Sequence, residues 1–315
     1  TSAMRNIEEM GERITDSMDL EKERGITIKA KNASIYYKDT KINIVDTPGH
    51  ADFGGEVERT LNMVDGVLLL VDAKEGPMHQ TRFVLKKALE KNLKAIVVIN
   101  KFDTKDARIN EVVDKTFDLF VELGATPEQL DFHIVYASAV NGTASLESDG
   151  NGKDLIPLFE TILKHIPPPT INEGEIFKML VVDLGYDNYK GKMAIGKIQS
   201  GEVKKSDQLV ELKIDGSKTN GKVTALLAYQ GLLRKEIESA RAGDIVAISG
   251  FLEVSIGETL SDIRDLVPLP PLLVDEPTVK MTFGVNTSPF SGREGSLVTS
   301  RNIRERLFKE IEINV

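Results

Sequence analysis

The sequence predicts a doubly wound α/β domain, an all-β barrel after it, and the beginning of a third unit. Continuous apolar runs at 66–72, 95–99 and 132–137 are typical of strands buried on both faces of a parallel sheet. They alternate with amphipathic segments of helical periodicity, as in an α/β domain. After Pro167, Pro168 and Pro169 the periodicity changes to short strand-like runs separated by glycine turns, which indicates the barrel.

The first domain is predicted over residues 1–168. Residues 8–25 are strongly charged and predict a solvated loop or a short helix. Two strand-like runs at 33–37 and 41–45 are separated by Lys38-Asp39-Thr40, which predicts a hairpin. The later elements are expected, in order, as helix 56–63, strand 66–72, helix 80–91, strand 95–99, helix 110–123, strand 132–137 and helix 155–165.

The barrel is predicted over residues 172–270. Its strands are expected at 178–184, 191–200, 201–203, 208–214, 221–228 and 244–249. A strand at 278–285 and a charged amphipathic helix at 299–311 begin a third domain over residues 275–315. We expect this unit to be truncated at Val315, because it stops before it could close a core.

Composition narrows the classes of protein and of site. The 315 residues carry a net charge of −9 and contain no cysteine, which excludes disulfides and thiolate metal sites and fits a reducing cytosol. No apolar run approaches the ~20 residues of a membrane-spanning helix, and no secretory signal is visible. Because an acidic chain does not hold nucleic acid by bulk charge, we expect no DNA partner; docking on a ribonucleoprotein through a local patch stays open.

The stretch D-T-P-G-H follows the predicted strand 41–45. Asp46 leaves the strand end pointing into a crevice, and Pro48 and Gly49 turn the chain so that backbone N–H groups can face an anion. In open α/β sheets this is where phosphates and metals bind. Upstream, the Thr27 hydroxyl is a plausible Mg²⁺ ligand, with Asp46 acting through water and the Thr27 N–H free for a γ-phosphate oxygen.

The motif N-K-x-D, at residues 100–103, follows the predicted strand 95–99. The carboxylate of Asp103 can accept two parallel hydrogen bonds from guanine, whereas adenine lacks that pair of donors. Asn100 can bind a base edge and tie neighbouring loops, and the aliphatic stem of Lys101 can lie along the purine face. After strand 132–137, Ser138 and Ala139 can offer a backbone N–H to the guanine carbonyl oxygen. The ordered set predicts a guanine-nucleotide site.

Several stretches resemble the translational GTPases: elongation factors Tu and G, LepA and TypA/BipA. The group resemblance lies in R-G-I-T-I at 24–28 and D-T-P-G-H-A-D-F at 46–53. The TypA/BipA resemblance lies in G-G-E-V-E-R at 54–59, V-V-I-N-K at 97–101, Q-L-D-F at 129–132 and V-N-T-S-P-F at 285–290. The resemblance implies a P-loop-type G domain, a β-barrel domain II and the start of a ferredoxin-like α+β domain III.

The resemblance also implies an activity and partners. These are binding of GTP and GDP with Mg²⁺, hydrolysis of GTP as a switch on the ribosome, small-subunit contacts, a monomeric state and a cytoplasmic location. The family's hydrolytic histidine maps to His50, which would position the attacking water when the sarcin–ricin loop of ribosomal RNA engages it. We interpret His79, His133 and His165 as structural or surface residues. The resemblance does not choose among stress response, growth in the cold and ribosome assembly.

One part of the family pattern is missing. No G-x-x-x-x-G-K-[ST] occurs in the chain, and Arg5-Asn6-Ile7 runs directly into Glu8, where the family has its first strand and phosphate loop. We therefore expect severely reduced GTP binding and hydrolysis, and unpaired strand edges where the lost strand would lie. Two alternatives stay open: a hydrolysis-defective fragment that only binds the ribosome or another partner, and a LepA-like or elongation-factor-like GTPase.

Overall fold

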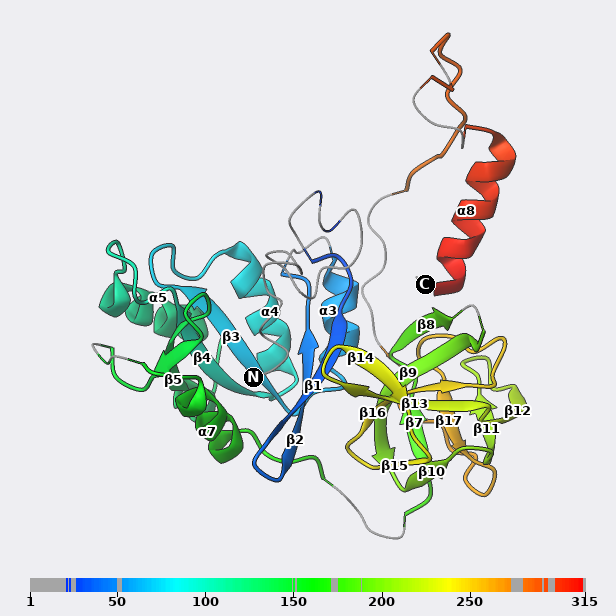
Figure 1. Ribbon diagram of the computed structural model, residues 1–315, viewed down its shortest axis with the longest axis horizontal. Coiled ribbons are helices and arrows are strands. Elements are labelled where there is room, and N and C mark those ends of the chain that lie inside the picture. Colours follow the sequence, from blue (N-terminus) through cyan, green and yellow to red (C-terminus); the bar gives the residue numbers. More distant parts are fainter. Residues whose placement is uncertain are drawn as a thin grey trace. The chain divides into compact units, whose positions relative to one another are not determined.

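The chain divides into two compact units in a computed structural model (Figure 1). The described residues are 21, 23, 27–49, 53–148, 150, 152–170, 175–187, 189–272, 280–290, 292–293 and 298–313. The first unit comprises residues 1–170 with 229–233, and the second comprises 171–228 with 234–315. The domain limits expected at 168, 172, 270 and 275 stay predictions.

A sheet of parallel strands organises the first unit. Its order is β3 (Gly66–Asp72), β4 (Lys94–Asn100), β5 (His133–Ser138) and β6 (Thr143–Ser145), and only β6 runs antiparallel to its neighbour. The register aligns Asp72 with Asn100, and Asn100 with Ala137. The carboxyl ends of the three parallel strands therefore meet at one edge of the sheet, as the apolar runs predict.

Helices cover both faces of this sheet (Figure 1). On one face, α4 (His79–Glu90) and α5 (Ile109–Glu122) bury Leu85 and Phe120 against strand residues such as Val97. On the other face, α7 (Ile156–His165) packs Leu158 and Ile162 on β4 and β5. The doubly wound arrangement is thus confirmed, because alternate residues of each strand reach opposite helical layers.

The hairpin of the first unit does not join this sheet. Strands β1 (Lys31–Tyr37) and β2 (Thr40–Asp46) pair antiparallel and form a two-stranded sheet of their own. The hairpin turn is held on α7, where the Tyr37 hydroxyl donates to Glu160 at 2.5 Å and the Tyr37 ring stacks on Phe159. The hairpin predicted from the runs at 33–37 and 41–45 is confirmed, and among the described strands β2 pairs with β1 rather than with a strand of the parallel sheet.

One face of strand β3 is partly exposed to solvent. Leu69 and Val71 are buried under α4 and α5, but Leu68 is 39% exposed and Leu70 is 59% exposed on the other face. Among the described strands, β3 has β4 as its one neighbour. Within the described part of the chain, the edge of β3 opposite β4 has no paired strand, and the expectation of an unpaired edge stays a prediction.

Short strands build the second unit around one apolar core. The strands are β7 (Lys178–Leu180), β8 (Asp183–Asp187), β9 (Gly191–Ser200), β10 (Glu202–Lys204), β11 (Gln208–Leu212), β12 (Lys218–Lys222), β13 (Ala225–Gln230), β14 (Leu233–Glu236), β15 (Ser239–Arg241), β16 (Ile245–Ser249) and β17 (Thr259–Asp262). Fully buried side chains such as Met179, Ile198 and Leu226 fill the space they enclose. The part of this unit from β7 to β17 is all-β and barrel-like, which confirms the predicted class.

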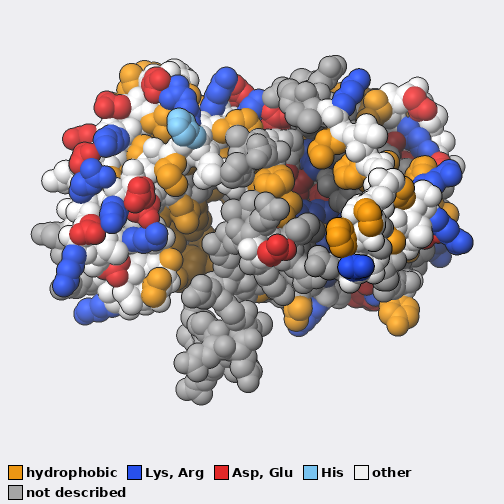
Figure 2. All heavy atoms as spheres, turned by 90° about the horizontal axis from the view of Figure 1, so that it is seen from above, with side chains coloured by type: hydrophobic (Ala, Val, Ile, Leu, Met, Phe, Trp, Pro, Cys, Tyr) orange, Lys and Arg blue, Asp and Glu red, His pale blue; other side chains and the backbone are white. Residues whose placement is uncertain are grey.

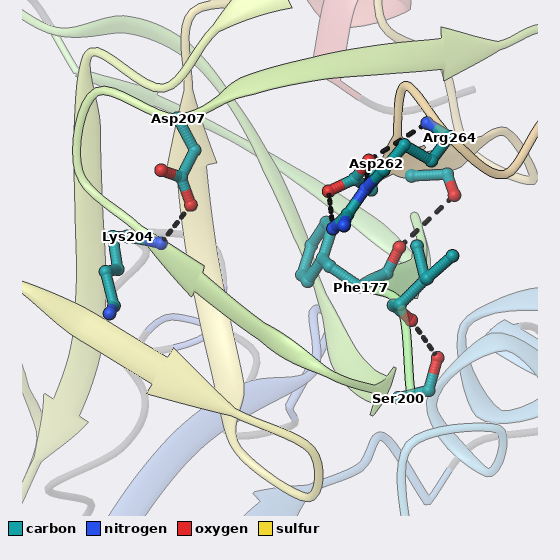
Figure 3. A network of polar contacts seen from close by, with 8 residues as sticks. Phe177, Ser200, Lys204, Asp207, Asp262 and Arg264 are labelled. Atoms are coloured by element: carbon teal, nitrogen blue, oxygen red, sulfur yellow. Dashed lines mark hydrogen bonds and ion pairs between the residues drawn. The ribbon is translucent and has the colours of Figure 1, made fainter. Parts of the chain in front are cut away.

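Side-chain hydrogen bonds fix the entry into this barrel (Figure 3). The Ser200 hydroxyl donates to the Ile176 carbonyl at 2.6 Å, and the Ser261 hydroxyl donates to the Phe177 carbonyl at 3.2 Å. Close by, Arg264 donates two hydrogen bonds to the carboxylate of Asp262, from Nε to Oδ1 and from Nη2 to Oδ2, each at 2.8 Å. These bonds satisfy backbone carbonyls that would otherwise be buried without partners.

Two groups of sequence-based expectations differ from the structure. The strand predicted at 278–285 is not formed over its described part, 280–285, where Met281 and Phe283 are exposed at 74% and 59%. Alternating apolar residues make a strand only when a partner strand and a buried face are present. The sequence pattern also missed short elements, namely α6 (Pro127–Leu130), β6, β12, β14, β15 and β17. The helix predicted at 299–311 is α8 (Ser300–Ile313).

The surface is mixed in charge. On the face that Figure 2 shows, the coloured Lys and Arg side chains are interspersed with Asp and Glu rather than gathered in one field. This agrees with a chain that has 40 basic and 49 acidic residues. Within the described part of the chain, no helix combines the length and apolarity needed to cross a membrane.

Candidate functional site

The loops after β4 and β5 are joined by side-chain hydrogen bonds. Because Asn100 pairs with Ala137 in the parallel register, the two loops leave the sheet as neighbours. The Ala139 N–H donates to Asn100 Oδ1 at 3.1 Å, and the Ser138 hydroxyl donates to Asp103 Oδ2 at 2.9 Å. The structure thus brings together four of the residues predicted to bind the base.

Asp103 is held at one oxygen and open at the other. Its Oδ2 accepts from Ser138 and from Asn141 Nδ2, the latter at 2.7 Å. Among the described residues no donor reaches Oδ1, and the residue itself is exposed. A ligand with two parallel N–H donors would take Oδ1 directly and would share Oδ2 with Asn141. Sequence reasoning missed Asn141, although its place just after Ser138-Ala139 was a usable signal.

An ion pair with Asp72 holds the Lys101 side chain across the ends of β4 and β3. Its backbone has φ +62°, and its Nζ lies 2.7 Å from Asp72 Oδ2. The Lys101 side chain is nevertheless 59% exposed, so its stem presents an apolar edge beside Asp103 that suits a planar ring. The hydrogen bond that Lys101 donates to Asp72, and then the negative charge of Asp72, raise the pKa of Lys101.

Asp72 is a second residue that sequence reasoning missed. Burial raises the pKa of Asp72, but hydrogen bonds from Lys101 and from the N–H groups of Lys74 and Glu75 outweigh burial and leave it below its ordinary value. Both N–H groups donate to Oδ1, at 2.8 and 3.1 Å. Asp72 therefore stays ionised and orients Lys101. The available signal was its position as the last residue of an apolar strand.

One predicted donor is engaged inside the protein. Sequence reasoning offered the Ala139 N–H to a ligand carbonyl, but in the structure this N–H donates to Asn100. A ligand carbonyl must share the N–H with Asn100 or displace it. The contact carries out the other role predicted for Asn100, which was to tie neighbouring loops.

The residues predicted for phosphate and metal lie at one end of the hairpin. Asp46 pairs with Lys31 in the register of β1 and β2, and Thr27 is just upstream of Lys31. The Ala30 N–H donates to Glu56 Oε1 at 3.0 Å, which ties the Thr27 segment to α3 (Gly54–Thr60). His50 and the junction of residues 7 and 8 lie outside the described residues.

The two residues predicted to hold magnesium carry donor atoms of the right kind. Thr27 and Asp46 supply a hydroxyl and a carboxylate, the hard oxygen ligands that Mg²⁺ takes in small number beside water and phosphate. Among the described residues, a Cβ added at Gly49 would meet nothing within 4 Å. Where the chain is described, no group of three or more His, Cys, Asp or Glu could hold a metal by itself.

Two of the other histidines meet although they are far apart in sequence. The rings of His133, at the start of β5, and His165, at the end of α7, have centroids 3.3 Å apart. Burial, and then the positive charges of His133 and Lys164, lower the pKa of His165. His79 is exposed at the start of α4. None of the three contacts Asn100 or Asp103 in the described contacts.

Comparison with known proteins finds one matching family in each of the two units. Residues 1–168 match the family described as elongation factor Tu GTP binding domain, and residues 191–261 match elongation factor Tu domain 2. The chain is 54% identical over 308 residues to the large ribosomal subunit assembly factor BipA of Bacillus subtilis, covering 98% of this chain and 50% of that protein. It is 55% identical over 302 residues to BipA of Synechocystis, covering 96% and 51%.

A solved structure shows the same fold. Translation elongation factor SelB of Methanococcus maripaludis, in complex with the GTP analogue GppNHp, superposes with a TM-score of 0.60 at 27% identity, covering 76% of this chain and 50% of that one. The chain spans about half the length of the curated relatives it matches.

Proposed function

Since this chain belongs to the family of the elongation factor Tu GTP-binding domain, we propose that it binds GTP and GDP with Mg²⁺ and hydrolyses GTP as a conformational switch on the ribosome. The observation that carries the proposal is the carboxylate of Asp103. It is held at Oδ2 by Ser138 and Asn141 and leaves Oδ1 for a ligand.

The loops after β4 and β5 read the base. Guanine presents an N1–H and an exocyclic amine side by side, and Asp103 accepts from both, whereas adenine would leave the carboxylate unpaired. The Lys101 stem lies along one ring face while Asp72 holds its ammonium group. Asn100 keeps the two loops in register through Ala139. The protein thus supplies a preorganised edge, which lowers the entropic cost of binding.

The hairpin end serves the phosphates. Thr27 and Asp46 would hold Mg²⁺, Asp46 through water, and the Gly49 N–H would face the γ-phosphate. When bound, Mg²⁺ neutralises charge on the β- and γ-phosphates. His50 would orient the attacking water, a role that consists of positioning rather than covalent chemistry. Residues 8–28 and 46–60 are the segments expected to differ between the GTP and GDP states.

The partner is proposed to be the ribosome. The relatives quoted above are ribosomal subunit assembly factors by name, and the second unit matches domain 2 of elongation factor Tu. We propose contacts to the sarcin–ricin loop through the first unit, contacts to the small subunit through the barrel, and a monomer acting in the cytoplasm.

A second function is favoured by one observation. The chain has no G-x-x-x-x-G-K-[ST] motif, and β2 and β3 lie in different sheets. A protein that reads guanine without a phosphate loop would dock on the ribosome without turning over GTP. Competition by guanosine separates the two functions: a phosphate site makes GDP a far stronger competitor, and a base site alone makes guanosine and GDP nearly equal.

Ribosome-stimulated hydrolysis tests the proposed activity. We expect the 315-residue chain to release phosphate from GTP when ribosomes are added. Replacing His50 with Ala should remove about two orders of magnitude of this rate, the usual scale for a lost catalytic positioning group. His79→Ala, at an exposed position on α4, is the matched control and should leave the rate unchanged. Equal rates for the His50 and His79 variants would refute the role of His50, and no stimulated release at all would favour the second function.

A further inference from the structure

A carboxyl group is buried in the barrel without a hydrogen bond to one of its oxygens. Glu211 lies on β11 and is 1% exposed, and its Oε1 has no hydrogen-bond partner. Leu209, two residues earlier on the same face of the strand, belongs to the barrel core. The side chain of Glu211 therefore points inward. An ionised carboxylate in that position would be expensive unless it were paired.

A second buried carboxyl group lies beside the first. Glu258, 6% exposed, stands just before β17, and its Oε2 accepts the Ser255 N–H at 2.7 Å. Strand β17 is the direct neighbour of β11, with Glu211 opposite Leu260. Burial, and next the charge of Glu258, raise the pKa of Glu211 from 4.5 to about 7. Two like charges in such a space cannot both be ionised cheaply.

The nearby cation does not compensate the pair. Lys213 Nζ lies 3.7 Å from Glu211 Oε1 but only 2.9 Å from Oε2 of Glu253, which is 78% exposed. The ammonium group of Lys213 thus makes its shorter contact with the exposed carboxylate of Glu253, not with Glu211. On β12, the residue opposite Glu211 is Thr219, which does not titrate. The charged groups that face Glu211 are therefore Glu258, Lys213 and Glu253.

The loop that carries Glu253, Ser255 and Glu258 is anchored at both sides of the pair. Phe251 and Val254 are buried in the barrel core. The Gly257 N–H donates to the Val181 carbonyl at 2.8 Å, and the Val181 N–H donates to the Glu258 carbonyl at 2.9 Å. Residues 251–258 thus form a short loop that is anchored on the barrel and carries Glu258 at its end.

We propose that Glu211 and Glu258 share one proton, and that loss of this proton loosens the 251–258 loop from β11 and destabilises the barrel. The direction follows from linkage. The folded state keeps a proton that the unfolded chain loses near pH 4.5, so this contribution to stability is complete below pH 4.5 and is lost as pH rises through about 7. The barrel unit is then a proton-sensitive element, a property independent of nucleotide binding.

Glu211→Gln tests the proposal in the full chain. The amide stays neutral, so the variant should match the parent at pH 4, below the unfolded-state pKa of 4.5, and should unfold at a temperature about 5 °C or more above the parent at pH 8.5. Glu258→Gln should give the same gain, and the double variant should add little, because one proton serves both groups. Glu202→Gln, on β10, is the control for loss of a surface charge and should show no pH-dependent difference.

Amide hydrogen exchange reports the loop itself. After correction for the intrinsic pH dependence, peptides covering 251–258 should exchange at least tenfold faster at pH 8.5 than at pH 6 in the parent, and equally at both in Glu211→Gln. A protonated-carboxyl infrared band that is present at pH 6 and lost in Glu211→Gln would confirm the proton. The shared proton is refuted if the unfolding temperatures of Glu211→Gln and the parent differ by the same amount at low pH and at pH 8.5. It is also refuted if the 251–258 loop of the parent exchanges equally fast at pH 6 and pH 8.5.

Discussion

Replacing Asp103 with Asn is expected to abolish tight guanine-nucleotide binding. The amide keeps the shape of the side chain but exchanges one acceptor for a donor, which then faces the exocyclic amine of guanine. Hydrogen bonds to a charged group contribute roughly 1.5–3 kcal/mol each, so loss of at least 3 kcal/mol, or about 100-fold in affinity, should follow. Titration with a fluorescent GDP analogue measures this loss.

A change of preferred base is the sharper part of the same prediction. Xanthine carries an oxygen where guanine carries the amine, so Asp103→Asn should bind xanthosine diphosphate better than GDP. Asp106→Asn, three residues on, removes the carboxylate of another aspartate, 70% exposed and paired with Lys74, and it should change neither affinity. A folded Asp103→Asn variant with unchanged GDP affinity would show that the base is not read at this position.

Gly250→Ala is expected to cause the largest loss of stability in the barrel. Gly250 has φ +123°, and a Cβ there would lie 1.9 Å from the Lys222 carbonyl oxygen. Backbone cannot move aside as the end of a flexible side chain can, so β16 and the segment after β12 must separate. We expect the free energy of unfolding of the second unit to fall by about 3 kcal/mol or more. Amide exchange in β13 and β16 under increasing denaturant measures it.

Gly216→Ala separates steric conflict from backbone strain. Gly216 also has a positive φ, +84°, but a Cβ there meets nothing within 4 Å. Left-handed strain alone costs roughly 1–2 kcal/mol, so this variant should stay folded. Equal losses at the two glycines would contradict the close approach of Gly250 to β12. Nucleotide binding by the first unit should be unaffected by Gly216→Ala.

Sequence patterns predicted the elements whose burial is regular. The run at 95–99 is apolar on both faces and forms β4, a strand with neighbours on both sides; the run at 66–72 also forms a parallel strand, but Leu68 and Leu70 on one of its faces are exposed, so burial of both faces was wrongly expected there. The same reasoning aligned the residues after β4 and β5. It failed for 278–285, because alternation describes one face of a strand but says nothing about whether a partner strand exists.

Sequence patterns could not identify residues whose roles depend on contacts between distant parts of the chain. Asp72 and Asn141 carry no motif, and their roles appear only when Lys101 and Asp103 are placed beside them. Glu211 read as one polar residue in a strand, and its burial depends on the approach of Glu258 from a distant loop. The separation of β2 from β3 likewise depends on which strand is available to pair, a property of the whole sheet rather than of either strand.

The most direct test of the central claim is nucleotide competition on the unmodified chain. A fluorescent guanine nucleotide is bound in the presence of Mg²⁺ and displaced in turn by GDP, guanosine and ADP. Because Asp103 pairs with donors that adenine lacks, guanine-containing ligands should displace the probe at concentrations at least 100-fold lower than ADP does. Displacement by ADP and GDP at equal concentrations would contradict the assignment of the loops after β4 and β5 as the guanine site.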